Sequence, residues 1–178
     1  MKYIALLRGI NVGGKSIIKM ADLKKVFEEE GLKKVSTYIN SGNVLFETGE
    51  NNQVKLEEIL EKAVFKKFKI NNPIVVISDK EFKTVVDECP KNWKSNEDIR
   101  KYIAFVKKPY RASDVTKDME LKEGIDFVVI GKGAVYMSTV LSGITKSKLS
   151  RMSTKSSYKF ITIRNFNTVQ KLLELCKK

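Results

Sequence analysis

Residues 3–16 have the sequence YIALLRGINVGGKS, and this stretch sets the order of the first elements of the chain. Its apolar run, residues 3–7, predicts a strand, and a helical pattern of apolar residues begins near Met20. The segment between them carries Arg8 and three glycines. A glycine-bearing loop between a strand and a helix presents backbone N–H groups to anions, so we expect a polar site here.

The segment Gly9–Ser16 also fits the phosphate-loop pattern GxxxxGK[ST]. That motif requires a parallel sheet and a helix that begins at its lysine. The next two predicted strands, residues 35–40 and 43–48, are separated only by Ser41-Gly42, which predicts an antiparallel hairpin with a two-residue turn. We therefore interpret the match as coincidental, with Gly13-Gly14 forming a tight turn of positive φ, and a nucleotide-binding phosphate loop stays the alternative.

Composition narrows the class of protein. A hydrophobic fraction of 42% in 178 residues is sufficient for a core, in one domain or in two small ones. No uninterrupted apolar run approaches the ~18 residues of a membrane span. The short apolar run before Arg8 does not form a signal peptide. We therefore expect a cytoplasmic protein without a membrane partner.

The chain contains no histidine, which excludes the commonest catalytic arrangements. Ser-His-Asp and Cys-His pairs and histidine metal ligands are unavailable to it, so a general acid or base must be Asp, Glu, Lys, Tyr or Cys. Cys89 and Cys176 lie far apart and match no metal-binding spacing. Each is expected to be a buried free thiol, and the sequence indicates no metal site and no particular cofactor.

The net charge of +13 is concentrated in the second half of the chain. Residues 1–90 hold 15 Lys and Arg against 13 Asp and Glu, whereas residues 91–178 hold 19 against 8. No acid occurs between Asp126 and Glu174. This basic, hydroxyl-rich interval can face phosphate groups, or it can be an ordinary solvated surface rich in lysine; the sequence leaves both open.

Hydrophobic periodicity predicts the same order of elements twice. The predicted strands of the first half span residues 2–7, 35–40, 43–48 and 73–78, and its helices span 20–30, 54–69 and 79–89. The predicted strands of the second half span residues 101–107, 126–130, 134–139 and 158–163, and its helices span 113–122, 145–152 and a last helix to Cys176, capped by Asn165 or Asn167.

This order is βαββαβ with a trailing helix, once in each half. It predicts an α+β protein made of two ferredoxin-like units in tandem, each with an antiparallel sheet. We place the first unit at residues 1–90, a polar linker at 91–99 and the second unit at 100–178.

Three strings in the sequence resemble one known family. YIALLRGINVGG at residues 3–14, KMADLKKVFEEEGLKKVSTYINSGNVLF at 19–46 and TIRNFNTVQKLLEL at 162–175 are similar to the DUF1697 family of small bacterial proteins. The resemblance implies two ferredoxin-like domains in one chain and no established activity, because the family is defined as one of unknown function. One departure is Phe166, where the family usually has tryptophan; the change keeps an aromatic anchor and loses the indole N–H donor.

The motif blocks lie at predicted strand ends and loops, where binding residues concentrate on a rigid scaffold. We therefore expect a ligand-binding site made of residues from these blocks: Arg8, Asn11, Gly13, Gly14, Tyr38, Ser41, Asn43, Thr162, Arg164 and Asn165. Turn and cap chemistry explains several of them equally well. Arg8 and Arg164 are predicted at strand ends of different units, and they converge if the two sheets face a common cleft. Paired guanidiniums suit carboxylate or phosphate groups.

Two functions remain open at this stage. The first is a binding module for a phosphate-bearing ligand, a nucleotide or nucleic acid, in a polar cleft between the domains. The alternative is an enzyme that acts on a small anionic substrate held by Arg8 and Arg164, although only Tyr38, Ser41 and Lys15 are available nearby as reactive groups. The sequence does not indicate which ligand is bound or whether the protein forms oligomers.

RNA-recognition motifs share the βαββαβ frame and stack bases on aromatic side chains of the third strand. Phe46 and Tyr136 lie on the corresponding strands here, but the aromatic spacing of those motifs is not met. We therefore expect Tyr3, Tyr102 and Tyr136 to be packing residues.

Overall fold

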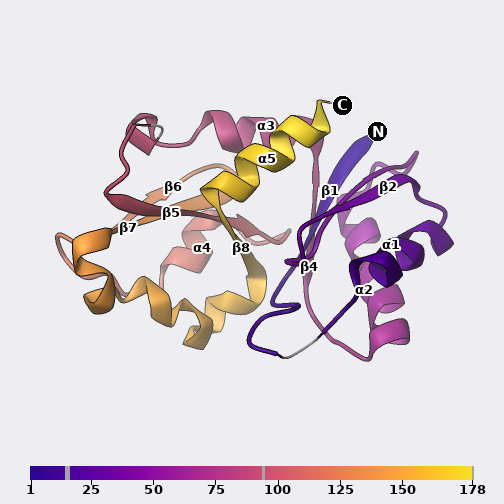
Figure 1. The fold of residues 1–178 in the computed structure, drawn as a ribbon, viewed down its shortest axis with the longest axis horizontal. Coiled ribbons are helices and arrows are strands. Elements are labelled where there is room, and N and C mark those ends of the chain that lie inside the picture. Colours follow the sequence, from indigo (N-terminus) through magenta and orange to yellow (C-terminus); the bar gives the residue numbers. More distant parts are fainter. Residues whose placement is uncertain (15–16, 94, 178) are drawn as a thin grey trace. The chain divides into compact units, whose positions relative to one another are not determined.

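A computed structural model describes residues 1–14, 17–93 and 95–177 of the chain (Figure 1). It contains two units, one made of Met1–Phe82 with Leu172–Lys178 and one made of Lys83–Lys171. Each unit holds one four-stranded sheet in which all neighbouring strands are antiparallel. The predicted α+β class with two antiparallel sheets is therefore confirmed.

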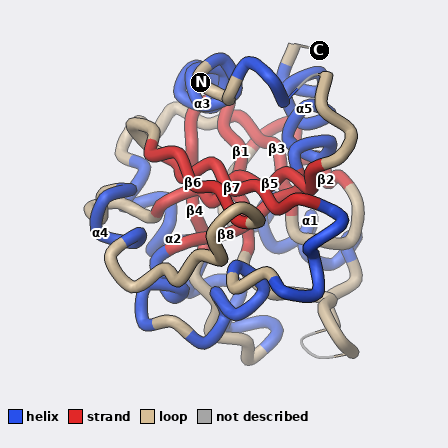
Figure 2. Tube along the Cα trace, turned by 90° about the vertical axis from the view of Figure 1, so that its left-hand side faces the viewer, coloured by secondary structure: helices blue, strands red, loops and turns tan. Residues whose placement is uncertain are grey.

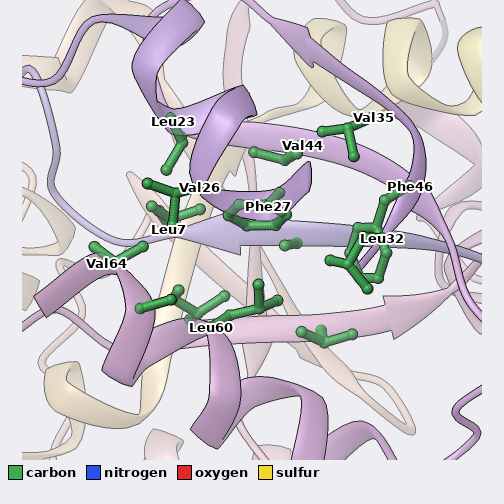
Figure 3. Close-up of a cluster of buried hydrophobic side chains, with 14 of the residues drawn as sticks. Leu7, Leu23, Val26, Phe27, Leu32, Val35, Val44, Phe46, Leu60 and Val64 are labelled. Atoms are coloured by element: carbon green, nitrogen blue, oxygen red, sulfur yellow. The ribbon is translucent and has the colours of Figure 1, made fainter. Parts of the chain in front are cut away.

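The first unit is a sheet covered on one face by two helices. Its elements are β1 (Lys2–Leu7), α1 (Met20–Glu29), β2 (Lys33–Tyr38), β3 (Asn43–Glu47), α2 (Gln53–Phe68), β4 (Ile74–Ser78) and the start of α3 (Asp79–Asp87). The strand order is β2-β3-β1-β4, so β1 is paired on both sides. Alternate side chains of a strand point to the same face, and Leu7 and Phe46 on this face meet Phe27 of α1 and Leu60 of α2 (Figure 3).

β4 forms one edge of this sheet, and glutamates cover the N–H groups on its outer side. The acceptors are Glu61 Oε1 for Ile74 N (2.8 Å), Glu57 Oε1 for Val76 N (3.0 Å) and Glu81 Oε2 for Ser78 N (3.2 Å). A row of exposed N–H groups would otherwise be a template for another strand. The carboxylates therefore satisfy the backbone and protect the edge from further pairing.

Replacing Glu57 by alanine is expected to lower the free energy of unfolding by about 1–3 kcal/mol, the cost of leaving a buried donor without an acceptor. Glu57 is only 1% exposed, so water does not replace its oxygen at Val76 N. Urea denaturation followed by circular dichroism measures the change. Glu58→Ala is the matched control, because Glu58 is the exposed neighbour on the same helix. Equal losses in both variants would contradict this role of Glu57.

The second unit has the same strand arrangement, in the order β6-β7-β5-β8. Figure 2 draws the strands of both units in red. The elements of the second unit after α3 are η1 (Lys91–Trp93), β5 (Ile99–Val106), α4 (Ala112–Thr116), β6 (Asp126–Ile130), β7 (Ala134–Val140), the three 3-10 helices η2 (Leu141–Lys146), η3 (Leu149–Thr154) and η4 (Ser156–Phe160), then β8 (Ile161–Asn165) and the start of α5 (Phe166–Cys176). On one face of the sheet, Val106 and Val135 pack with Val115 of α4 and Met152 of η3.

Aromatic residues bury the other face of this sheet. The Trp93 ring lies edge-on to Tyr136 at 6.0 Å and to Phe166 at 5.3 Å between centroids. The Tyr136 hydroxyl donates to the Val85 carbonyl at 2.7 Å. All three rings are nearly inaccessible to solvent. Phe166 thus serves as the aromatic anchor expected from the sequence.

Two local predictions in the second unit are wrong, and a hydrogen-bonded carboxylate accompanies the early end of each predicted helix. The helix predicted over residues 113–122 ends at Thr116, and the Asp118 side chain beyond it accepts hydrogen bonds from Ser156 and Ser157. The helix predicted over 145–152 is interrupted at Ser147, whose hydroxyl donates to Asp126 Oδ1 at 2.6 Å. Figure 1 shows the short helical turns of residues 141–160 in orange.

Two further boundaries differ from prediction. Tyr38 pairs with Asn43, so the hairpin loop has four residues, 39–42, and not the two predicted. Ile39 and Gly42 both have positive φ there, at 48° and 75°. The last strand begins at Ile161 and not at Tyr158, because residues 156–160 form a 3-10 helix.

Candidate functional site

Asn11 joins two loops at one end of the first sheet. Its Nδ2 donates to the carbonyls of Ile18 (2.9 Å) and Asn40 (2.8 Å), and its Oδ1 accepts from Ile18 N (2.7 Å). The residue has φ of 56°, a left-handed conformation that asparagine tolerates better than most residues. Asn11 thereby brings the loop after β1 against the hairpin loop. The Asn11 side-chain amide therefore makes hydrogen bonds that hold these two loops together.

Asn43 and Ser41 have a similar structural role within the hairpin. Asn43 is fully buried, and its Nδ2 donates to Tyr38 O (3.0 Å) and Ser41 Oγ (2.9 Å). Leu7 N donates to the Gly42 carbonyl at 2.8 Å, which attaches the loop to the end of β1. The structure thus brings Asn11 against the hairpin that holds Tyr38, Ser41 and Asn43, through contacts that also explain these residues as parts of the fold.

The glycine loop itself is exposed. Gly13 and Gly14 have φ of 59° and 73°, as the tight-turn interpretation predicts. Arg8 is half-buried, and its backbone N–H donates to Pro73 O at 3.2 Å. Lys15 and Ser16, which complete the phosphate-loop pattern, lie outside the described residues. Because β1 pairs antiparallel with both neighbours and α1 begins at Met20, the parallel-sheet context of that motif is not met.

The predicted residues of the second unit lie on β8 and at its end. Arg164 is buried, and its Nη1 donates to Thr162 Oγ1 (2.8 Å) and Ile163 O (2.9 Å). Burial disfavours the charged guanidinium and lowers the Arg164 pKa to about 10. Asn165 Oδ1 accepts from Asn167 N (2.9 Å), so Asn165, one of the two predicted caps, caps α5. Convergence of Arg8 and Arg164 concerns two different units and stays a prediction.

The described residues offer little nucleophilic or metal-binding chemistry. Burial raises the pKa of the Cys176 thiol to about 11, so it stays protonated and unreactive at neutral pH. The partly buried Cys89 donates its S–H to Val85 O at 3.7 Å. Within residues 1–14, 17–93 and 95–177, no three Cys, Asp or Glu residues are placed to hold a metal ion. No helix in the same ranges is long and apolar enough to cross a membrane.

An exposed cluster in the second unit was not predicted from the sequence. The Tyr110 and Phe160 rings stack with centroids 3.6 Å apart and planes inclined by 26°. Lys159 Nζ lies 4.8 Å from the Phe160 centroid, and Lys107 N donates to Phe160 O at 2.8 Å. With their chain neighbours these residues form what we call the basic-aromatic patch: Lys107, Lys108, Tyr110, Arg111, Lys159 and Phe160.

The sequence carries a signal for half of this patch. Residues 107–111 read KKPYR, three cations around an aromatic residue. Its partner Phe160 is fifty positions further along the chain, and only the pairing of β5 with β8 brings the two together. The acid-free interval contributes Lys159 here, whereas its Lys148 and Lys155 both form ion pairs with Glu120.

Comparison with known proteins agrees with the motifs. A family model described as "Protein of unknown function (DUF1697)" matches residues 1–136. A solved structure described as that of "conserved bacterial protein SP0830 from Streptococcus pneumoniae" is similar, with 28% sequence identity, 98% of each chain covered and a TM-score of 0.84. No curated protein matches the chain. The chain belongs to the DUF1697 family, whose function is unknown.

Proposed function

We propose that this protein binds single-stranded nucleic acid and that the basic-aromatic patch is the contact surface. The observation that carries the proposal is Tyr110, a residue that is 41% exposed although its ring stacks on Phe160. Proteins that bind single strands combine cations for the phosphates with aromatic faces for the bases. Stacking on one aromatic side chain contributes about 1–3 kcal/mol per base.

The cations of the patch supply the other half of such a surface. Lys108, Arg111 and Lys159 are exposed around the two rings. Asp114, three residues after Arg111, accepts from Arg111 N at 3.1 Å and pairs with Lys117 at 3.2 Å. The four cations of the patch supply positive charge, and cations bind phosphates by releasing their counterions.

We also infer that each unit is ferredoxin-like. In both sheets the first strand lies between the third and the fourth, which is the order of a βαββαβ unit. The surface used by RNA-recognition motifs of this frame is not available here, because Phe46 and Tyr136 are buried. This favours a loop surface such as the basic-aromatic patch.

Neutralising the patch is expected to weaken binding and its salt dependence together. The variant replaces Lys107, Lys108, Arg111 and Lys159 by glutamine, and the probe is a fluorescent oligothymidine of about 15 nucleotides, within the range of known single-strand sites. Fluorescence anisotropy between about 50 and 200 mM salt should give a slope smaller by roughly 0.7 for each phosphate that the variant no longer neutralises. Tyr110→Ala should lower affinity at least about fivefold without changing the slope.

The control replaces four exposed lysines of the first unit, Lys25, Lys62, Lys66 and Lys67, by glutamine. It removes the same net charge, so a general electrostatic attraction predicts the same loss in both quadruple variants. Equal slopes in the two variants, or unchanged affinity in Tyr110→Ala, would contradict the assignment of the patch.

A further inference from the structure

A second feature of the second unit is a pocket of about 250 Å³ between the sheet and the 3-10 helices. Its floor is formed by Tyr102 of β5, Met137 of β7 and Ile163 of β8. Met137 lies opposite Tyr102 in the β5–β7 register. Ile144 of η2 and Leu149 of η3 line the opposite wall.

The apolar residues of this pocket are incompletely covered. Tyr102, Leu149 and Ile163 pack against the core of the unit, yet each remains half-buried. Protein interiors are normally packed to the density of organic crystals, so an open space lined by such side chains is unusual. Its walls offer contact to an apolar molecule, and contact with such a molecule would remove their remaining surface from water.

One cationic side chain, that of Arg100, lines this pocket. Arg100 lies two residues before Tyr102 on β5, so both side chains project from the same face of the strand. Among residues 1–14, 17–93 and 95–177, its guanidinium has no hydrogen bond or ion pair with another side chain. Thr139 and Ser147 also line the pocket, and their hydroxyls donate to Asp126 Oδ1, at 3.0 and 2.6 Å.

We infer that this pocket binds a small molecule with an apolar body and one carboxylate or phosphate group. The apolar walls contact the apolar body of the molecule, and the Arg100 guanidinium binds its anionic group. The planar guanidinium can donate two parallel hydrogen bonds to a carboxylate or phosphate. The volume is slightly below the ~300–1,000 Å³ of pockets for drug-sized ligands. A single aromatic ring or a short aliphatic chain therefore fits. This site shares no residue with the basic-aromatic patch and does not depend on nucleic-acid binding.

The inference is tested with phenylacetate, phenyl phosphate and uncharged benzyl alcohol as probes, titrated into the whole protein and followed by ¹H–¹⁵N NMR. At least one anion should bind at least about tenfold more tightly than the alcohol, and shift the amide signals of Tyr102, Met137 and Ile163. Comparing the two anions identifies which group the site prefers. Absence of saturable binding by either anion up to about 10 mM, a range in which even weak fragments bind, would overturn the inference.

Two variants and a control locate the bound molecule. Arg100→Gln should weaken anion binding about tenfold while leaving the alcohol unchanged. Arg100 also lines a polar hollow with Lys101 and Asn165, so Ser150→Phe, which fills the apolar pocket from its exposed rim, separates the two places. Arg151→Gln, an exposed arginine of η3 outside the pocket, should bind like wild type. Wild-type affinity in Ser150→Phe, with melting temperature unchanged, would show that the anion lies elsewhere.

Discussion

Replacing Asp126 by alanine is expected to lower the free energy of unfolding by about 3–5 kcal/mol, because several buried donors lose their acceptor at once. Its Oδ1 accepts from the hydroxyls of Thr139 (3.0 Å) and Ser147 (2.6 Å). Its Oδ2 accepts from the backbone N–H groups of Lys122 (3.0 Å) and Lys148 (2.8 Å). One carboxylate therefore ties β6, β7 and two loops together.

The pH dependence of this loss has a defined sign. Burial opposes ionisation, but the hydrogen bonds from Ser147 and from the backbone of Lys122 and Lys148 outweigh it, so the pKa of Asp126 is lowered. A carboxyl group with a lowered folded-state pKa contributes stability above its unfolded pKa, about 3.9 for aspartate. That contribution is lost as the pH falls through the lower folded-state pKa. The difference between wild type and Asp126→Ala should therefore shrink in acid.

Urea denaturation at neutral pH and below about pH 3, under the ordinary aspartate pKa, measures both effects. The fluorescence of Trp93, the single tryptophan of the chain, reports on the second unit, in which it is buried. Asp126→Asn keeps the volume and one acceptor oxygen and should lose less stability. Asp98→Ala is the exposed control. A difference between wild type and Asp126→Ala that is the same at both pH values would show that the ionised carboxylate is not the cause.

Asp126 also explains why one part of the fold was predictable and another was not. Strands such as β1 and helices such as α2 follow from apolar periodicity, which is a local property of the sequence. The division between η2 and η3 depends on a carboxylate more than twenty positions earlier in the chain. The helical propensity of residues 145–152 does not contain information about that distant contact. The tertiary hydrogen bonds to Asp126 therefore override the helical propensity.

The candidate site shows the same limit at the level of single side chains. Asn11, Asn43 and Asn165 were recognised as polar residues at strand ends, where ligands often bind. Their amides are used for loop contacts and a helix cap, which the sequence motif alone does not separate from binding. Tyr110 was missed because its stacking partner is remote in sequence, although the cations around it are visible.

Gly42 provides the second large effect. Gly42→Ala is expected to lower the free energy of unfolding by about 2–5 kcal/mol, from left-handed strain of roughly 1–2 kcal/mol and overpacking of roughly 1–3 kcal/mol. Its φ is 75°, and an added Cβ would lie 2.8 Å from Leu7 Cβ and 2.9 Å from Ile10 Cδ1. Leu7 is fully buried in the core of the first unit, so it cannot retreat without disturbing β1 (Figure 3).

Gly13→Ala is the matched control for the close approach. Gly13 also has a positive φ, 59°, but an added Cβ would meet no atom within 4 Å. Gly13→Ala should therefore lower the free energy of unfolding by only about 1 kcal/mol. The left-handed strain of alanine lowers it, and the smaller conformational entropy of the unfolded chain offsets part of that loss. Urea denaturation of the two variants, with wild type, separates strain from packing. Equal losses would show that positive φ alone selects glycine at position 42. A much larger loss for Gly42→Ala would show that the close approach of the hairpin loop to the end of β1 requires glycine at position 42.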